Sequence, residues 1–175
     1  HCTETINPLL VQVDLGAPTC SISVNPASWT SSTPEVIFSS SPGGSISSVT
    51  TSFLWTSSGA VIVDSTLVSS PYLLTGASDG VHEIKVVVMN EARASQVCSV
   101  TAYKDASQPD ALSNLEGIPQ YSTSSEVLSI SFDTRDQHSG LSTVKYFIDD
   151  VLVHEQSSVQ SPSDTTSIPI SKNIN

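Results

Sequence analysis

The stretch DGVHEIKVVVMNEARASQVCSVTAYKD, from Asp79 to Asp105, predicts a β-hairpin. In its first half, Ile84, Val86 and Val88 recur at every second position, and after a polar loop the alternation resumes from Val97 to Tyr103. A period of two, rich in β-branched residues, favours strands over a helix. The stretch is therefore expected to close an all-β domain.

Short apolar segments precede this hairpin at the spacing of a β-sandwich. Turn residues such as Pro42-Gly43-Gly44 and Ser58-Gly59 separate them. About seven short strands at intervals of roughly 8–12 residues are typical of an immunoglobulin-like sandwich. The expected strands are Cys20–Val24, Glu35–Ser39, Val49–Trp55, Ala60–Val63, Tyr72–Leu74 and the two halves of the hairpin.

The chain repeats itself at an offset of roughly 91 to 95 residues, which predicts two copies of one unit. WTSSTPEVIFSSS, from Trp29 to Ser41, resembles YSTSSEVLSISFD, from Tyr121 to Asp133. SSVTTSFLW ending at Trp55 resembles LSTVKYFI ending at Ile148. The fold class expected is therefore two tandem immunoglobulin-like β-sandwich domains.

The predicted domains are residues 18–104 and 111–175, with a linker at 105–110. Residues 1–17 form the end of a preceding domain, an edge strand or a linker, and the sequence leaves these alternatives open. The second domain has a predicted hairpin around Asp149-Asp150 and a strand from Ser167 to Ile170, but no counterpart of the closing hairpin. It is expected to be incomplete, and the natural chain to continue past Asn175.

The composition limits the partners. Ser and Thr make up 51 of 175 residues, Lys and Arg only six, and the formal net charge is -11. Such a chain repels nucleic acid and anionic membranes. No apolar run approaches the roughly 18 residues of a membrane span. We therefore expect no nucleic-acid partner.

Two of the three cysteines occur in similar segments, CSISV at Cys20 and CSVTA at Cys98. They predict a disulfide between the first and last strands of domain one, typical of an exported protein. Two free thiols are the alternative, because spacing does not fix the distance between the Cα atoms. Cys2 is left over, and either bridges elsewhere, replaces one partner of the pair or lies near a lipidated terminus.

The densest polar cluster is FDTRDQHSG, in which Asp133 and Asp136 are candidate calcium ligands. In the alternative interpretation both aspartates cap turns of a solvated loop, and Arg135 offsets their charge. No other cofactor is expected. The four histidines lack the spacing of a zinc site and are predicted to be surface residues. Asp79-Gly80 and Asp149-Asp150 are interpreted as hairpin turns with Asp at positive φ.

Catalytic motifs are missing from the sequence. It contains no G-x-S-x-G elbow and no phosphate-binding loop, so we expect that the protein is not an enzyme. Trp29, in a polar loop, is the best candidate for an exposed ligand contact, and capping of the core is the alternative. Trp55 alternates with Phe53 and is predicted to lie in the core, as in other sandwiches with Trp on the third strand.

Three segments resemble the tandem immunoglobulin-like repeats of bacterial surface proteins: VDLGAPTCSISVNPASWTSS, DTRDQHSGLSTVKYFIDD and GVHEIKVVVMNEARASQ. In those repeats a VD-x-x-AP junction and a D-x-SG hairpin recur. The closing hairpin is also similar to that of PKD-type domains. His82 stands where an aromatic residue is usual, Asn90 replaces the common Asp, and Trp55 to Gly59 lacks the acidic turn of PKD domains.

This resemblance implies a spacer, an adhesive stalk or a ligand-binding module. We therefore expect a non-enzymatic structural or adhesive module that is extracellular or on the cell surface, with neighbouring domains of the same longer chain as partners. One alternative is a binding module that recognises a host, prey or matrix surface protein or glycan through its end loops. Another is an accessory domain of a secreted hydrolase.

Overall fold

Strands are the only regular secondary structure in the described part of the computed structural model, which comprises residues 16–44, 48–65, 68–111, 113–116, 127–148, 150–157, 166–167 and 170–173. The predicted all-β class is confirmed. Across these ranges no helix is long and apolar enough to cross a membrane.

The chain divides into two compact units. Unit 2 includes two short segments that lie, in sequence, between strands of unit 1. Unit 1 takes its described residues from His1–Ala27, Pro34–Leu74 and Val81–Ala102, and unit 2 from Ser28–Thr33, Thr75–Gly80 and Tyr103–Asn175.

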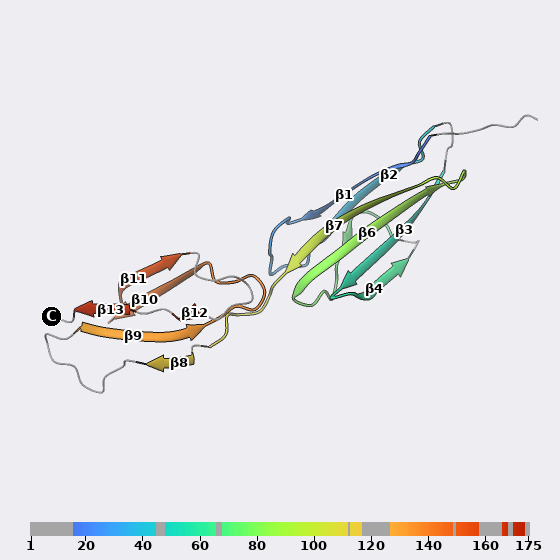
Figure 1. The fold of residues 1–175 in the computed structure, drawn as a ribbon. Helices are drawn as coiled ribbons and strands as arrows, with labels where there is room; N and C mark the ends of the chain where they lie inside the picture. The colour runs from blue at the N-terminus through green and yellow to red at the C-terminus, as the bar shows by residue number, and fades with distance from the viewer. Residues whose placement is uncertain are drawn as a thin grey trace, which may run out of the picture. The chain divides into compact units, whose positions relative to one another are not determined.

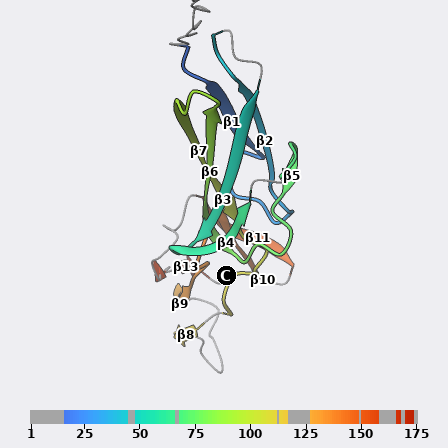
Figure 2. The ribbon, with the colours of Figure 1, turned by 90° about the vertical axis from the view of Figure 1, so that its right-hand side faces the viewer.

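The described residues of unit 1 form two sheets, whose strands are labelled in Figures 1 and 2. A few end residues of these strands belong to unit 2. The strand order is β1-β2-β5 in one sheet and β4-β3-β6-β7 in the other. All seven strands predicted between Cys20 and Tyr103 are confirmed. Their bounds are β1 Thr19–Asn25, β2 Glu35–Ser41, β3 Val49–Ser57, β4 Ala60–Ser65, β5 Tyr72–Leu73, β6 Gly80–Asn90 and β7 Ser95–Lys104.

The two sheets of unit 1 pack against each other through the residues that alternate along their strands. On β6 every second residue from His82 to Asn90 is buried. Phe53 on β3 contacts Phe38 on β2 and Tyr72 on β5, with ring centroids 5.9 and 4.8 Å apart. These rings lie between the sheets, so the period of two in the sequence defines one shared core.

His82 corrects the prediction that all histidines are surface residues. It is fully buried, and its Nδ1 accepts a hydrogen bond of 3.3 Å from the indole Nε1 of Trp55. Trp55 is 2% exposed, which confirms its predicted place in the core. A buried indole N–H needs an acceptor, which an imidazole provides and a purely hydrocarbon ring does not. This contact explains histidine at a position where the resembling repeats carry another aromatic residue.

Asn90 joins three segments at one end of unit 1. Its side chain is buried, and Nδ2 donates to the carbonyl oxygens of Gly16 at 3.0 Å and Pro42 at 3.4 Å. Its Oδ1 accepts a hydrogen bond of 3.0 Å from the backbone N–H of Ala94 in the β6–β7 turn. An ionised Asp has no N–H to donate to the two carbonyls, so the amide is required here.

The predicted turn after β2 depends on glycine. Gly43 has a φ of 70°, and a Cβ atom there would lie 2.1 Å from the carbonyl oxygen of Ala17. Because only glycine avoids this clash, the turn can approach the segment before β1 closely.

Unit 2 also contains two sheets among its described residues. In the first, β9 (Val127–Thr134) pairs with β8 (Ser113–Glu116), β12 (Thr166–Ser167) and β13 (Ile170–Asn173). β10 (Thr143–Ile148) and β11 (Val151–Ser157) form the second, a hairpin.

The turn of this hairpin is predicted correctly, since Asp150 has a φ of 61°. Asp149 lies outside the described residues. The strand predicted from Ser167 to Ile170 matches the observed strands only at its two ends, because β12 ends at Ser167 and β13 begins at Ile170.

The β3–β4 and β10–β11 hairpins share a one-residue bulge. On β3 the register shifts after Trp55, which leaves Ile62 without a register partner on that strand. On β10 it shifts after Tyr146, which leaves Val153 without one. Ile62 and Val153 are 91 positions apart, an offset within the range that the sequence repeat predicts.

Candidate functional site

Cys20 and Cys98 form the predicted disulfide, with Cα atoms 6.1 Å apart. Cys20 lies on β1 and Cys98 on β7, so the bond joins the two sheets of unit 1. Among the described strands of unit 1 it also joins the first to the last, across a sequence separation of 78. The alternative of two free thiols is therefore not the one that the structure adopts. Cys2 lies outside the described residues.

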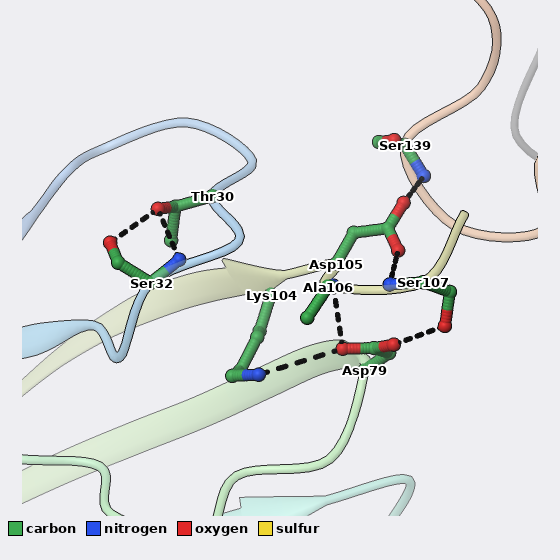
Figure 3. A network of polar contacts seen from close by, with 8 residues as sticks. All are labelled: Thr30, Ser32, Asp79, Lys104, Asp105, Ala106, Ser107 and Ser139. Atoms are coloured by element: carbon green, nitrogen blue, oxygen red, sulfur yellow. Dashed lines mark hydrogen bonds and ion pairs between the residues drawn. The ribbon is translucent and has the colours of Figure 1, made fainter. Parts of the chain in front are cut away.

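Asp79 holds the segment that follows β7, within unit 2. Its Oδ1 accepts a hydrogen bond of 2.9 Å from the backbone N–H of Ala106, and the Ser107 hydroxyl donates to Oδ2 (Figure 3). The Lys104 Nζ lies 3.6 Å from Oδ1. The hydrogen bond from Ser107, followed by that from Ala106, lowers the pKa of Asp79 below its ordinary value of 3.8. The carboxylate form thus stabilises this segment.

This geometry corrects the interpretation of Asp79-Gly80 as a hairpin turn. Gly80 has a φ of 127°, but Asp79 is not among the residues with positive φ, and β6 begins at Gly80. Asp79 functions through its carboxylate and not through its backbone conformation.

Asp105 joins the same segment to the loop after β9. Its side chain accepts hydrogen bonds from the backbone N–H of Ser107 at 3.1 Å and of Ser139 at 2.9 Å (Figure 3). Burial raises the pKa of the Asp105 carboxyl, but hydrogen bonds, first those from Ser139 and then that from the backbone N–H of Ser107, outweigh burial and lower it. The network therefore stabilises an ionised Asp105.

Asp136, one of the two calcium candidates, caps the turn after β9. It is buried, and its Oδ1 accepts hydrogen bonds from the backbone N–H of His138 at 3.1 Å and of Ser139 at 3.2 Å. Asp133, the other candidate, lies half-buried on β9. Within the described ranges, no three His, Cys, Asp or Glu side chains are grouped so that they could hold a metal ion. Calcium binding stays a prediction.

Trp29, the candidate ligand contact, is half-buried in unit 2. Its ring centroid lies 5.3 Å from that of Tyr103 and 6.4 Å from that of His138. The neighbouring carbonyl of Thr30 accepts a hydrogen bond of 2.8 Å from the N–H of Asp105. Trp29 thus packs on two rings and keeps part of its indole exposed.

Sequence reasoning missed Asp105 and the ring neighbours of Trp29. One local signal was available, because Asp105 and Asp136 each accept a hydrogen bond from the backbone N–H two residues later. This is the Asx-turn pattern, for which a short acid followed by small polar residues is typical. No local pattern indicates that Tyr103 and His138 lie beside Trp29, since these residues are far apart in the sequence.

A surface pocket of about 440 Å³ is formed by residues of β6 and β7 in the four-stranded sheet. It is lined by Glu83, Lys85, Ser99, Val100 and Thr101. Glu83 and Lys85 pair with each other at 3.9 Å, and both side chains are at least half exposed. The pocket offers hydroxyls and one weak ion pair, but no aromatic platform and no activated nucleophile.

Comparison with known proteins adds no relative: no family model matches the chain, and no similar curated protein or solved structure was found. The function is therefore argued from the chain's own geometry. The disulfide holds two strands together, and the loop network holds the segment after β7.

Proposed function

We propose that the chain is a non-enzymatic spacer made of two immunoglobulin-like β-sandwich domains, part of an exported bacterial cell-surface or secreted protein. Its role would be structural or adhesive, holding a binding region away from the surface. The observation that carries the proposal is the Cys20–Cys98 disulfide, because it joins the two strands through which tension enters and leaves unit 1.

The immunoglobulin-like assignment is supported by the strand order of unit 1. Seven strands in sheets of three and four, with a buried Trp on the third strand, are features of such sandwiches. The position of the disulfide differs. Antibody domains join their second and sixth strands, whereas this chain joins β1 to β7.

That difference favours a mechanical role. A pull on β1 passes through Cys20 and Cys98 directly to β7, so the strands between them carry no load. The separation of 78 residues corresponds to about 270 Å of extended chain, which the intact disulfide keeps folded.

Export is supported by the same bond and by the composition. Disulfides persist in oxidising compartments and are rare in the cytosol. A surface rich in Ser and Thr, with a net charge of -11, is compatible with a spacer that does not adhere to anionic membranes.

Single-molecule force spectroscopy on the chain tests the spacer function. With the disulfide intact, unit 1 is expected to lengthen little under load, and reductant should release about 270 Å more. The double variant Cys20→Ala/Cys98→Ala should behave like reduced protein, and Cys2→Ala, the matched control, like the oxidised one. If the oxidised chain releases the full length under load, the spacer mechanism is wrong.

Recognition of a glycan is a second candidate, favoured by the partly exposed Trp29 beside Tyr103 and His138. Aromatic rings bind sugars by stacking, and charged or polar neighbours orient them. Binding on a glycan array that disappears in Trp29→Ala would favour this function. The control is Phe147→Ala, which removes an exposed aromatic ring outside the core and should keep the binding. Absence of binding by the wild-type chain would leave the spacer as the better proposal.

A further inference from the structure

Three aromatic side chains from separate segments of the chain lie together in unit 2. Trp29 belongs to the loop after β1, Tyr103 to the end of β7, and His138 to the loop after β9. Each of the three is half-buried, so each keeps part of its ring exposed. These three residues, the ring cluster, therefore contribute to the surface of unit 2.

Asp105 is bonded to the segments that hold the rings. Its backbone N–H donates a hydrogen bond of 2.8 Å to the carbonyl of Thr30, in the loop after β1. Its carboxylate accepts the N–H of Ser139, in the loop after β9, at 2.9 Å (Figure 3). Tyr103 lies two residues before it in the chain. Asp105 thus joins both loops to the end of β7.

The two loops are held in different ways. Thr30 and Lys104 form a parallel β-bridge, so backbone pairing also fixes the loop after β1. The loop after β9 is joined to this bridge through the carboxylate of Asp105, which is 8% exposed and thus shielded from competition by water. Loss of the carboxylate should therefore release His138 from the other two rings.

The polar groups next to Trp29 in the loop after β1 are hydroxyls. Thr30 Oγ1 and Ser32 Oγ share a hydrogen bond of 2.7 Å, and the N–H of Ser32 donates to Thr30 Oγ1 at 3.1 Å (Figure 3). Ser32 is exposed and Thr30 is half-buried. A hydroxyl both donates and accepts hydrogen bonds. This loop therefore suits a ligand that itself presents hydroxyl groups.

The charges of the surrounding network do not favour an anionic ligand. Asp105 and Asp136 are buried, and the Nζ of Lys104 lies 3.6 Å from the carboxylate of Asp79. Together with Arg135, the network has two cations against three carboxylates. The whole chain has a net charge of -11, which repels anions at long range. Sialylated or sulfated sugars are thus disfavoured.

The geometry points to a binding site for an uncharged sugar, in which the ring cluster provides the stacking surface and Asp105 positions His138 within it. An aromatic ring stacks on the apolar face of a sugar, and polar groups at its edge bind the sugar hydroxyls. This inference rests on the glycan-recognition candidate above, to which it adds the class of sugar and a positioning residue.

A glycan array that presents uncharged oligosaccharides and their sialylated and sulfated forms tests the class of sugar. The wild-type chain should bind uncharged glycans, and their acidic forms at least about tenfold more weakly, because the acidic chain repels them. Equal or tighter binding of the acidic forms would overturn the class of sugar. Binding of no glycan would overturn the site and leave the spacer function unaffected.

Asp105→Ala tests the positioning residue, on the same array and by NMR. It should weaken binding at least about tenfold and shift the ring protons of His138 towards those of free histidine, whereas the Tyr103 ring protons move little. The matched control is Ser107→Ala, which removes the hydroxyl that bonds Asp79 but keeps the N–H that bonds Asp105. This control should bind like the wild type.

Unchanged His138 signals in Asp105→Ala would overturn the positioning role, whether or not the chain binds a glycan. This role is thus tested separately from glycan recognition. Circular dichroism and intact mass check that each variant is folded and disulfide-bonded. If Asp105→Ala does not fold, Asp105→Asn takes its place. It keeps one of the two acceptor oxygens, so smaller changes in the same direction are expected.

Discussion

β3 of unit 1 and β10 of unit 2 correspond to each other in the repeat but have different neighbours. β3 pairs with β4 on one edge and, over nine register positions, with β6 on the other. Among the strands that the structure describes, β10 pairs with β11 alone. The core-facing residues of the two strands have the same burial, since Trp55 and Tyr146 are both buried. The next residue on each strand differs, because Thr56 is half-buried and Phe147 is 58% exposed. Burial on the inner face is thus the same in the two strands, whereas exposure on the outer face differs between them.

The disulfide distinguishes unit 1 from unit 2, whose residues include no cysteine. Replacing Cys20 and Cys98 by Ala should lower the free energy of unfolding of unit 1 by about 4.5 kcal/mol, the chain-entropy value for a loop of 78 residues. Urea unfolding followed by tryptophan fluorescence measures this loss. Hydrogen exchange of the β10 and β11 amides is the control and should not change. A parallel loss of protection there would show that the copies do not unfold separately.

Substitution of two phenylalanines compares how much the inner face of unit 1 and the outer face of unit 2 contribute to stability. Phe53 is 1% exposed, and Phe53→Ala should cost about 3–5 kcal/mol of stability through the cavity that it leaves. Phe147 is 58% exposed, and Phe147→Ala should change stability by less than about 0.5 kcal/mol. Chemical denaturation of both variants measures the difference. Similar losses would contradict the assignment of Phe147 to an outer face.

Asn90, at the end of β6, makes side-chain hydrogen bonds at the closing hairpin of unit 1. Asn90→Ala removes the partners of the Gly16 and Pro42 carbonyls and of the Ala94 amide, and should cost about 1–3 kcal/mol. Asn90→Asp keeps the acceptor for Ala94 but turns a buried carboxylate oxygen towards the carbonyl oxygens of Gly16 and Pro42, so it should cost at least as much stability as Asn90→Ala. Thermal unfolding gives the order of the three proteins, and exchange of the Ala94 amide should accelerate only in Asn90→Ala.

The smallest effect concerns Asp79, whose pKa is lowered first by the Ser107 hydroxyl. Since the folded pKa lies below the ordinary value of 3.8, this carboxylate stabilises the fold above that pH. Its contribution is lost as the pH falls through the folded pKa. Ser107→Ala should raise the pKa of Asp79 towards 3.8, measured by NMR titration of its carboxyl carbon. Ser139→Ala, which alters the contacts of Asp105 and Asp136, should leave the pKa of Asp79 unchanged.

Most strands could be predicted because they depend on local alternation. Side chains at every second position face one side of a sheet, so Ile84, Val86 and Val88 indicate both the strand β6 and its inner face. The positive φ of Asp150 was predictable for the same reason, since a tight turn places local demands on its residues.

His82 and Asp79 show where local reasoning fails. Histidine is polar, so its position on β6 suggests the surface; Trp55 on the neighbouring strand provides the indole N–H that allows it to be buried. Asp79-Gly80 has the composition of a turn, but residues 106 and 107, distant in sequence, determine what the carboxylate does. In both cases the deciding partner is far along the chain.

The sequence by itself determined the all-β class, the order of the strands, the repeat and the candidate disulfide, because alternation, turn residues and spacing are local or periodic properties of the chain. The tertiary structure decided that Cys20 and Cys98 come within bonding distance, that His82 is buried, and that, among the described strands, β4 pairs only with β3 and β11 only with β10. These outcomes depend on contacts between residues distant in sequence, and no local pattern specifies which strands become neighbours.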